Sequence, residues 1–173
     1  MKKSRYIAVM GLMLALASAL QFLEGLIPIP LPLGVKPGIS SIVVMVVLVK
    51  FGFASAMTTA VLKSCFVFIT RGASAFFMSV SGGVFSVAVM GAFLAVSRRS
   101  KNGTGILPMS VLGGIFHNMG QLAAASVFTG SVLTFSYLPV LVISGTVSGL
   151  FTGTVFKLIL PHLHINSDKY ISG

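Results

Sequence analysis

The chain has 173 residues, of which 55% are hydrophobic and only 8% are charged, and its mean hydropathy is +1.04. A soluble domain is normally about a quarter charged, and a chain this short cannot bury so much apolar surface in a core of its own. The composition therefore excludes an ordinary soluble protein. It predicts an all-α integral membrane protein that forms a single domain over residues 1–173.

The formal charge of +10 arises from 12 lysines and arginines against two acids, Glu24 and Asp168. In a soluble protein this excess would suggest a nucleic-acid partner. Here the cations cluster beside apolar runs, around residues 2–5, 98–101 and 157–169. Such clusters are typical of cytoplasmic anchors, so we expect no nucleic-acid partner.

Apolar runs near the length of a membrane span recur along the chain, since a bilayer core calls for roughly 20 residues per helix. We expect six spans, at about residues 7–27, 39–50, 53–70, 76–96, 106–128 and 133–160. With both termini in the cytoplasm, nine of the twelve cations lie inside, which is the orientation that the positive-inside rule favours. The external loops are then residues 28–38, 72–75 and 129–134, in a multi-pass protein of the cell (cytoplasmic) membrane.

The first apolar run has a second interpretation. Basic residues, an apolar stretch and the sequence Ala17-Ser18-Ala19 also fit a cleaved signal peptide. Against this, the run continues to residue 27, and its removal would leave an odd number of spans that violates the charge rule.

Small residues recur every four positions in the first span, at Gly11, Ala15 and Ala19, and form a smooth strip. Such a strip either docks a partner helix or packs against the protein's own helices. Gln21 and Glu24 point away from it, toward a polar cavity. Because an ionisable group in hydrocarbon is costly, Glu24 is a functional candidate, unless it merely reaches the membrane interface.

The connection after the first span contains four prolines between residues 28 and 37, which bar a helix there. Ser40 or Ser41 is the expected cap of the next helix. Exposed amides at that helix start, with Lys36 beside them, would suit an anionic group, although a simple cap with a solvated lysine fits equally well.

Lys63 lies ten residues into the third span, too deep to reach water without strain. We expect it to meet Glu24, a ligand anion or a cavity. Arg71 follows two turns later and either meets the same ligand or is a plain interfacial arginine. Cys65, the one cysteine, is expected to be a buried small hydrophobe.

Polar side chains gather in the fifth span, where His117 and Gln121 stack one turn apart and Asn118 lies on the same broad face. This trio favours a cavity or a ligand. In the sixth span Gly145, Gly149 and Gly153 recur every four residues, which predicts close helix packing.

The sequence contains few residues that could carry out catalysis. There are no paired carboxylates, no aspartate-rich motif for magnesium and diphosphate, no HExxH and no ATP-binding loop. We therefore expect no enzyme activity, no metal and no cofactor.

Four segments carry a family resemblance: residues 28–34 (PIPLPLG), 35–38 (VKPG), 115–121 (IFHNMGQ) and 137–145 (YLPVLVISG). Together they resemble the family called Gx transporter, whose members are often labelled heptaprenyl diphosphate synthase component I, over about residues 8–156. That family is similar to the substrate-binding S components of energy-coupling-factor transporters, which are six-helix proteins. In those relatives an A-x-x-x-A strip on the first helix docks a transmembrane coupling subunit that works with ATPases, and residues 15–19 match that pattern.

The resemblance and the residues together lead to one main hypothesis. The chain is a substrate-capture subunit of a small-molecule transporter, energised by a separate coupling module, and the strip at Ala15 and Ala19 docks that module. Its ligand carries an anionic or strongly accepting group, or is related to isoprenoids, and eight residues would line the pocket: Gln21, Glu24, Lys36, Lys63, Arg71, His117, Asn118 and Gln121. The alternative is a non-catalytic membrane partner or scaffold in isoprenoid or quinone metabolism or in cell-surface redox chemistry.

Overall fold

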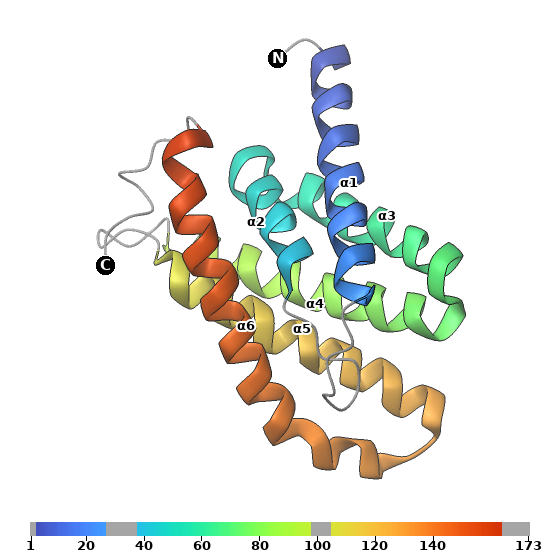
Figure 1. The fold of residues 1–173 in the computed structure, drawn as a ribbon. Helices are drawn as coiled ribbons and strands as arrows, with labels where there is room; N and C mark the ends of the chain where they lie inside the picture. Colours follow the sequence, from blue (N-terminus) through green and yellow to red (C-terminus); the bar gives the residue numbers. More distant parts are fainter. Residues whose placement is uncertain (1–2, 27–37, 98–104, 164–173) are drawn as a thin grey trace.

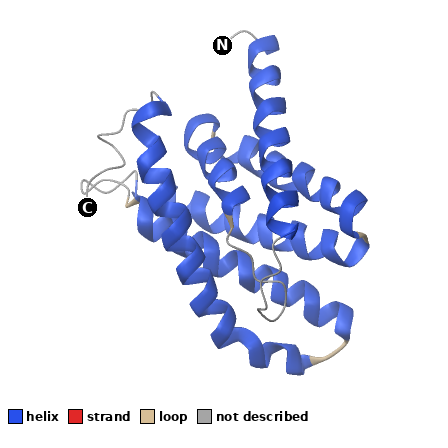
Figure 2. Ribbon diagram, viewed as in Figure 1, coloured by secondary structure: helices blue, strands red, loops and turns tan. Residues whose placement is uncertain are grey.

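A computed structural model describes residues 3–26, 38–97 and 105–163, and within these ranges the chain is helical apart from short connections (Figures 1 and 2). The main helices are α1 (Lys3–Leu26), α2 (Ile39–Phe51), α3 (Phe53–Arg71), α4 (Ala73–Ser97), α5 (Ile106–Thr129) and α6 (Leu138–Ile159). Short 3₁₀ segments, η2 (Val132–Tyr137) and η3 (Leu160–Leu163), flank α6. The predicted all-α fold with six main helices is confirmed.

Within the described ranges, four helical stretches are long and apolar enough to cross a membrane: Lys3–Leu26, Phe53–Arg71, Ala73–Ser97 and Val132–Leu163. The helix α5 has 24 residues, the length of a span, but carries the polar trio at its centre. The helix α2 is apolar and has only 13 residues. The fold thus fits a helical membrane protein, and the count of six spans stays a prediction.

Single glycines with positive φ angles separate α2 from α3 and α3 from α4. They are Gly52, with φ 92°, and Gly72, with φ 84°, a region that residues with a Cβ rarely adopt. The predicted loop over residues 72–75 is therefore wrong beyond Gly72. The carbonyl of Gly72 already accepts the N–H of Phe76 at 3.1 Å, so the helical bonds of α4 begin at once.

The helix α2 forms the centre of the bundle. All residues from 43 to 49 are buried, on every side of the helix, as expected for a helix surrounded by others. Around it pack residues of α3, α4, α5 and α6, including the fully buried Met109 and Phe156.

Contacts between helix ends show which ends lie together. The hydroxyl of Tyr6 lies 2.7 Å from that of Ser55, and Lys50 Nζ donates to the carbonyl of Leu163 at 3.3 Å. The beginning of α1, the α2–α3 turn and the end of α6 therefore share one end of the bundle (Figure 1). At the other end the ring of Phe77 on α4 packs against that of Phe128 on α5.

The helix α1 lies at the edge of the bundle, where it packs against α2 and α3 (Figure 1). Its buried residues are Ala17, Ser18 and Glu24. Gly11, Ala15 and Ala19 are all exposed, and a Cβ built on Gly11 meets nothing within 4 Å. The strip therefore does not pack against the described helices of this chain, and that interpretation of it is wrong.

The helices α5 and α6 approach each other through glycines. A Cβ on Gly145 would lie 2.8 Å from the backbone of Ile115, and one on Gly149 would lie 2.6 Å from that of Val111. Farther along, Gly153 packs against Ser110 of α5, whose hydroxyl lies 2.8 Å from that of Thr152. The three glycines of α6 thus face α5, with the two backbones close to contact at Gly145 and Gly149 and a side chain of α5 filling the space at Gly153.

Candidate functional site

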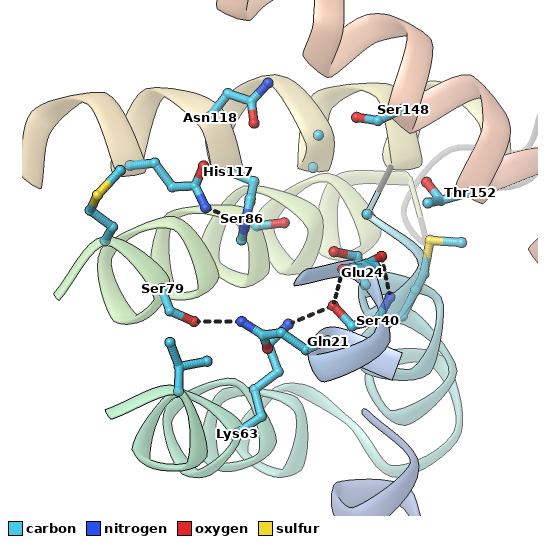
Figure 3. Close-up of a pocket in the computed structure, with 18 of the residues that line it drawn as sticks. Gln21, Glu24, Ser40, Lys63, Ser79, Ser86, His117, Asn118, Ser148 and Thr152 are labelled. Carbon is cyan, nitrogen blue, oxygen red and sulfur yellow. Dashed lines mark hydrogen bonds between the residues drawn. The ribbon is translucent and has the colours of Figure 1, made fainter. Parts of the chain in front are cut away.

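A cavity of about 210 Å³ lies between the end of α1, the start of α2 and the middle of the other four helices. Figure 3 shows how its polar side chains converge from these elements. Seven of the eight predicted site residues line it: Gln21, Glu24, Lys63, Arg71, His117, Asn118 and Gln121. The eighth, Lys36, lies outside the described residues.

The carboxylate of Glu24 meets the first turn of α2. Its Oε1 accepts the backbone N–H of Ser40 at 3.1 Å, and its Oε2 accepts the Ser40 hydroxyl at 3.4 Å. Glu24 is only 3% exposed, so the interpretation in which it merely reaches the membrane interface is wrong. Its negative charge lies at the positive end of the α2 dipole, where an anion is stabilised.

This arrangement corrects the expected helix cap. The residue before α2 is Gly38, in a left-handed conformation with φ 76°, and among the described residues next to it no side chain caps the helix. Ser40 already lies inside the first turn, so its N–H needs an acceptor from elsewhere. Glu24, sixteen residues earlier in the chain, supplies that acceptor.

Lys63 reaches the same serine from α3. Its Nζ donates to the Ser40 hydroxyl at 3.3 Å, and that hydroxyl in turn donates to Glu24. Lys63 is 3% exposed, and the expected partnership with Glu24 is thus made through Ser40 (Figure 3). The two opposite charges lower each other's cost of burial.

Gln21 is held at the end of a chain of hydroxyls between α1, α3 and α4. Its Nε2 donates to the Ser79 hydroxyl at 3.0 Å, which lies 2.9 Å from the hydroxyl of Ser64. Ser64 Oγ also donates to the carbonyl of Ala60 at 2.9 Å. Among the described residues no group donates to Gln21 Oε1, although that atom is buried.

Arg71, at the end of α3, crosses to the end of α1. Its guanidinium lies where a Cβ of residue 25 would be, and Gly25 leaves the space for it. Within the described part of the chain the guanidinium has no hydrogen bond or ion pair, and it lines the cavity. Arg71 therefore brings an unneutralised positive charge to one side of the cavity.

The polar trio of α5 divides into two roles. His117 Nε2 lies 3.2 Å from Gln121 Nε2, and a Cβ on Gly82 of α4 would lie 3.0 Å from the imidazole ring and 2.9 Å from Cγ of Gln121, so both side chains pack against α4. Asn118 instead donates both amide hydrogens to α6, at 2.9 Å to the Leu141 carbonyl and 3.1 Å to the Ser144 hydroxyl. It ties α5 to α6 while still lining the cavity.

Several lining residues were not predicted. They are mainly hydroxyl and thioether side chains, namely Ser79, Ser86, Ser110, Ser148, Thr152, Met45, Met78 and Met90. Serine is an ordinary packing residue in membrane helices, so its presence in the sequence gives little indication of a binding site. The spacing of Ser79 and Ser86, seven residues apart on one face of α4, was the one available hint.

Cys65 follows Ser64 and lies on the outer face of α3. It is exposed, so the expectation of a buried small hydrophobe is wrong. The adjacent Lys63 and Ser64 face inward, and the rotation of about 100° per residue takes Cys65 to the outside. Among the described residues no group of three or more His, Cys, Asp or Glu side chains could hold a metal ion.

Comparison with known proteins places the chain in a family. A family model described as heptaprenyl diphosphate synthase component I matches residues 13–159, which include most of the cavity. A search of curated proteins found no match, and neither did a search of solved structures. The matched region covers most of the chain, and we conclude that the chain belongs to the heptaprenyl diphosphate synthase component I family.

Proposed function

We propose that this chain is the substrate-binding subunit of a small-molecule transporter, similar to the S components of energy-coupling-factor transporters. The observation that carries the proposal is the cavity inside the helix bundle. Membrane helices rarely bury charge without a functional reason, yet Glu24, Lys63 and Arg71 all line this one space. The chain itself then binds the substrate, and it is not a catalyst.

The distribution of charge supports an orientation. Lys3, Arg5, Lys50 and Lys157 lie at the end of the bundle that contains the start of α1 and the end of α6, whereas Arg71 lies at the other end. By the positive-inside rule the first end faces the cytoplasm of a cell membrane and the Arg71 end faces outward. The cavity lies toward the outward end, where it would capture substrate from outside.

The exposed strip on α1 is the proposed docking face for the coupling module. Small side chains at Gly11, Ala15 and Ala19 allow another helix to approach closely, and the described helices of this chain leave them uncovered. We propose a transmembrane coupling subunit with its ATPases as the partner. Gentle solubilisation from native membranes, followed by mass spectrometry of the purified complex, tests this directly.

Bulky residues on the strip should block docking without unfolding the protein. We expect Ala15→Trp with Ala19→Trp to reduce recovery of ATPases at least roughly tenfold, whereas surface changes of this kind alter stability by about 0.5 kcal/mol or less. The matched control is Val147→Trp, at an exposed position of α6. Equal recovery of ATPases with both variants would rule out the strip as the docking face.

The imidazole of His117 should contribute to substrate binding. We expect His117→Ala to weaken binding by about tenfold, the usual loss for one neutral hydrogen bond, and to leave insertion and folding intact. The control is His162→Ala, on the exposed η3 segment away from the cavity. The measurement is the fraction of purified protein that retains small molecule in native mass spectrometry, and unchanged retention would remove His117 from the site.

The family description favours a second candidate, a non-catalytic membrane partner of a prenyl diphosphate synthase. In this role the chain would hold a soluble synthase at the bilayer, where its long isoprenoid product belongs. Co-purification separates the two candidates, because a prenyl synthase in place of ATPases would support the second.

A further inference from the structure

The hydroxyl chain beside the cavity fixes the orientation of the Gln21 amide. Ser64 has one hydroxyl hydrogen and donates it to the Ala60 carbonyl, so Ser79 must donate to Ser64 and accept from Gln21. The opposite orientation of the amide would require Ser79 to donate to Gln21, and the bond to Ala60 would be lost. Only the orientation with Nε2 toward Ser79 preserves all three hydrogen bonds, and it leaves Gln21 Oε1 without a donor among the described residues.

Gln21 Oε1 is a buried acceptor that no described residue satisfies. Buried polar atoms in proteins are nearly always paired, and an unpaired one costs about as much as a lost hydrogen bond. Because Gln21 lines the cavity, a bound molecule that offers an N–H or O–H would complete the set.

The Arg71 guanidinium supplies the complementary feature. It has five N–H donors and a permanent positive charge, and within the described residues none of the donors is used. The positive charge of Lys63 is offset by Glu24 through Ser40, so the surplus charge of the cavity belongs to Arg71. A carboxylate or a similar anion fits this fork.

These two groups lie close together. Gln21 and Gly25 are four residues apart on α1, so their side-chain positions are neighbours about 5–6 Å apart on one helix face. The Arg71 guanidinium occupies the position next to Gly25. A ligand that meets both groups must therefore carry its donor near its anionic group.

The size of the cavity limits the rest of the ligand. A cavity of about 150 Å³ holds benzene, and this one measures about 210 Å³. It has room for a ring or a short chain beside the acidic group. A heptaprenyl chain is several times larger and cannot be enclosed in it.

We propose that the substrate is a small acid with a hydroxyl or amino group on the carbon next to its anionic group. This inference rests on the proposed substrate-binding function and names its substrate class. Gln21 Oε1 accepts from the hydroxyl or amino group, Arg71 binds the anion, and the hydroxyl and thioether side chains deeper in the cavity surround the body.

Matched acids test the inference on the purified full-length chain in lipid nanodiscs. One set is mandelate, phenylglycine and phenylacetate, which share a body and differ in the hydroxyl, the amino group or neither. The smaller set is lactate, alanine and propionate. Calorimetry should give at least about tenfold tighter binding for the hydroxy or amino acid than for the acid without a donor, the factor expected for one hydrogen bond. Comparison of the hydroxy and amino members identifies the donor.

Two variants assign the residues. Gln21→Met removes the acceptor at similar size and should abolish the preference for the donor-bearing acid, leaving affinities equal within about twofold. Arg71→Gln should weaken all acids by roughly a hundredfold and leave the preference itself intact. His162→Ala, on the exposed η3 segment away from the cavity, is the control and should leave the affinities for all six acids unchanged.

The outcomes separate this inference from the proposed function. Equal binding of the acids with and without a donor in the unchanged protein would overturn it, as would no binding of any of the six acids. If native mass spectrometry then found a retained molecule of another class, the substrate-binding function would stand and the substrate class would be wrong. With neither a retained small molecule nor a coupling partner, both would fail.

Discussion

Replacing Glu24 with leucine is expected to lower the free energy of unfolding by about 3–5 kcal/mol, the usual result of leaving one member of a buried charge pair alone. The change removes the acceptor for the Ser40 N–H at the start of α2 and leaves Lys63 without its opposite charge. The first loss falls on α2 at the centre of the bundle and the second on α3, which packs against it. We therefore expect a low yield of folded protein and unfolding at a lower SDS fraction than for the unchanged chain.

Two further variants separate the effect of the Glu24 charge from the effect of the helix cap. Glu24→Gln keeps a carbonyl that can accept from Ser40, so its loss should be smaller than that of Glu24→Leu by about 1 kcal/mol, the value of a capping bond. Combining Glu24→Gln with Lys63→Met removes both charges together. We expect the double variant to be more stable than the sum of the single losses predicts, by about 1–3 kcal/mol.

The chain contains no tryptophan, so unfolding is best followed by the circular dichroism of its helices as the SDS fraction of mixed micelles rises. Lys50→Met is the control, since Lys50 is exposed and its described contacts are with the carbonyl of Leu163 and the ring of the adjacent Phe51, away from Glu24 and Lys63. If the loss of stability in the double variant equals the sum of the two single losses, Glu24 and Lys63 are not coupled through Ser40.

Enlarging Gly145 should have a comparable effect for a different reason. A Cβ there would lie 2.8 Å from the Cα of Ile115 and 2.9 Å from the carbonyl oxygen of Gly114, and backbone atoms cannot turn aside as a flexible side chain can. We expect Gly145→Ala to destabilise by about 1–3 kcal/mol and Gly145→Leu to prevent folding. The bonds from Asn118 to α6 should be lost with the contact.

Gly11→Ala is the matched control for Gly145→Ala. Both glycines lie inside helices, but a Cβ on Gly11 meets nothing within 4 Å. Since alanine is the better helix former, Gly11→Ala should be neutral or stabilising by up to about 1 kcal/mol. Size-exclusion chromatography of heated samples compares the two, and equal unfolding temperatures would refute the close packing of α5 and α6.

Helix positions were predictable because apolar length and glycine or charge breaks are local properties of the sequence. The start of α3 at Phe53 and of α5 at Ile106 matched the prediction. The loop over residues 72–75 failed because small residues such as Ala73 and Ala75 give no signal that separates a helix from a turn. A single positive-φ glycine was enough to end α3 and start α4.

The candidate site was predictable only in part. Charged and strongly polar groups such as Glu24, Lys63 and His117 stand out because the rest of each span is apolar, and they do meet around one cavity. The cap on α2 was not predictable, since Glu24 reaches Ser40 from another helix, and helix position cannot be read from local spacing. Nor did the sequence distinguish Asn118, which ties helices together, from His117 beside it.

The shortness of α2 bears on how substrate specificity evolves in proteins of this kind. A helix of 13 residues extends about 20 Å, roughly 10 Å less than the bilayer core, and its first turn lines the cavity at Gly38 and Ser40. The truncated helix therefore acts as the floor of the cavity. Lengthening or trimming α2 at this end by one turn would move the floor by about 5 Å and resize the cavity, and it would also move the point where Glu24 and Lys63 meet Ser40. Ligand size in related chains would then evolve by insertion and deletion at one helix start, together with changes at the residues that bind that start.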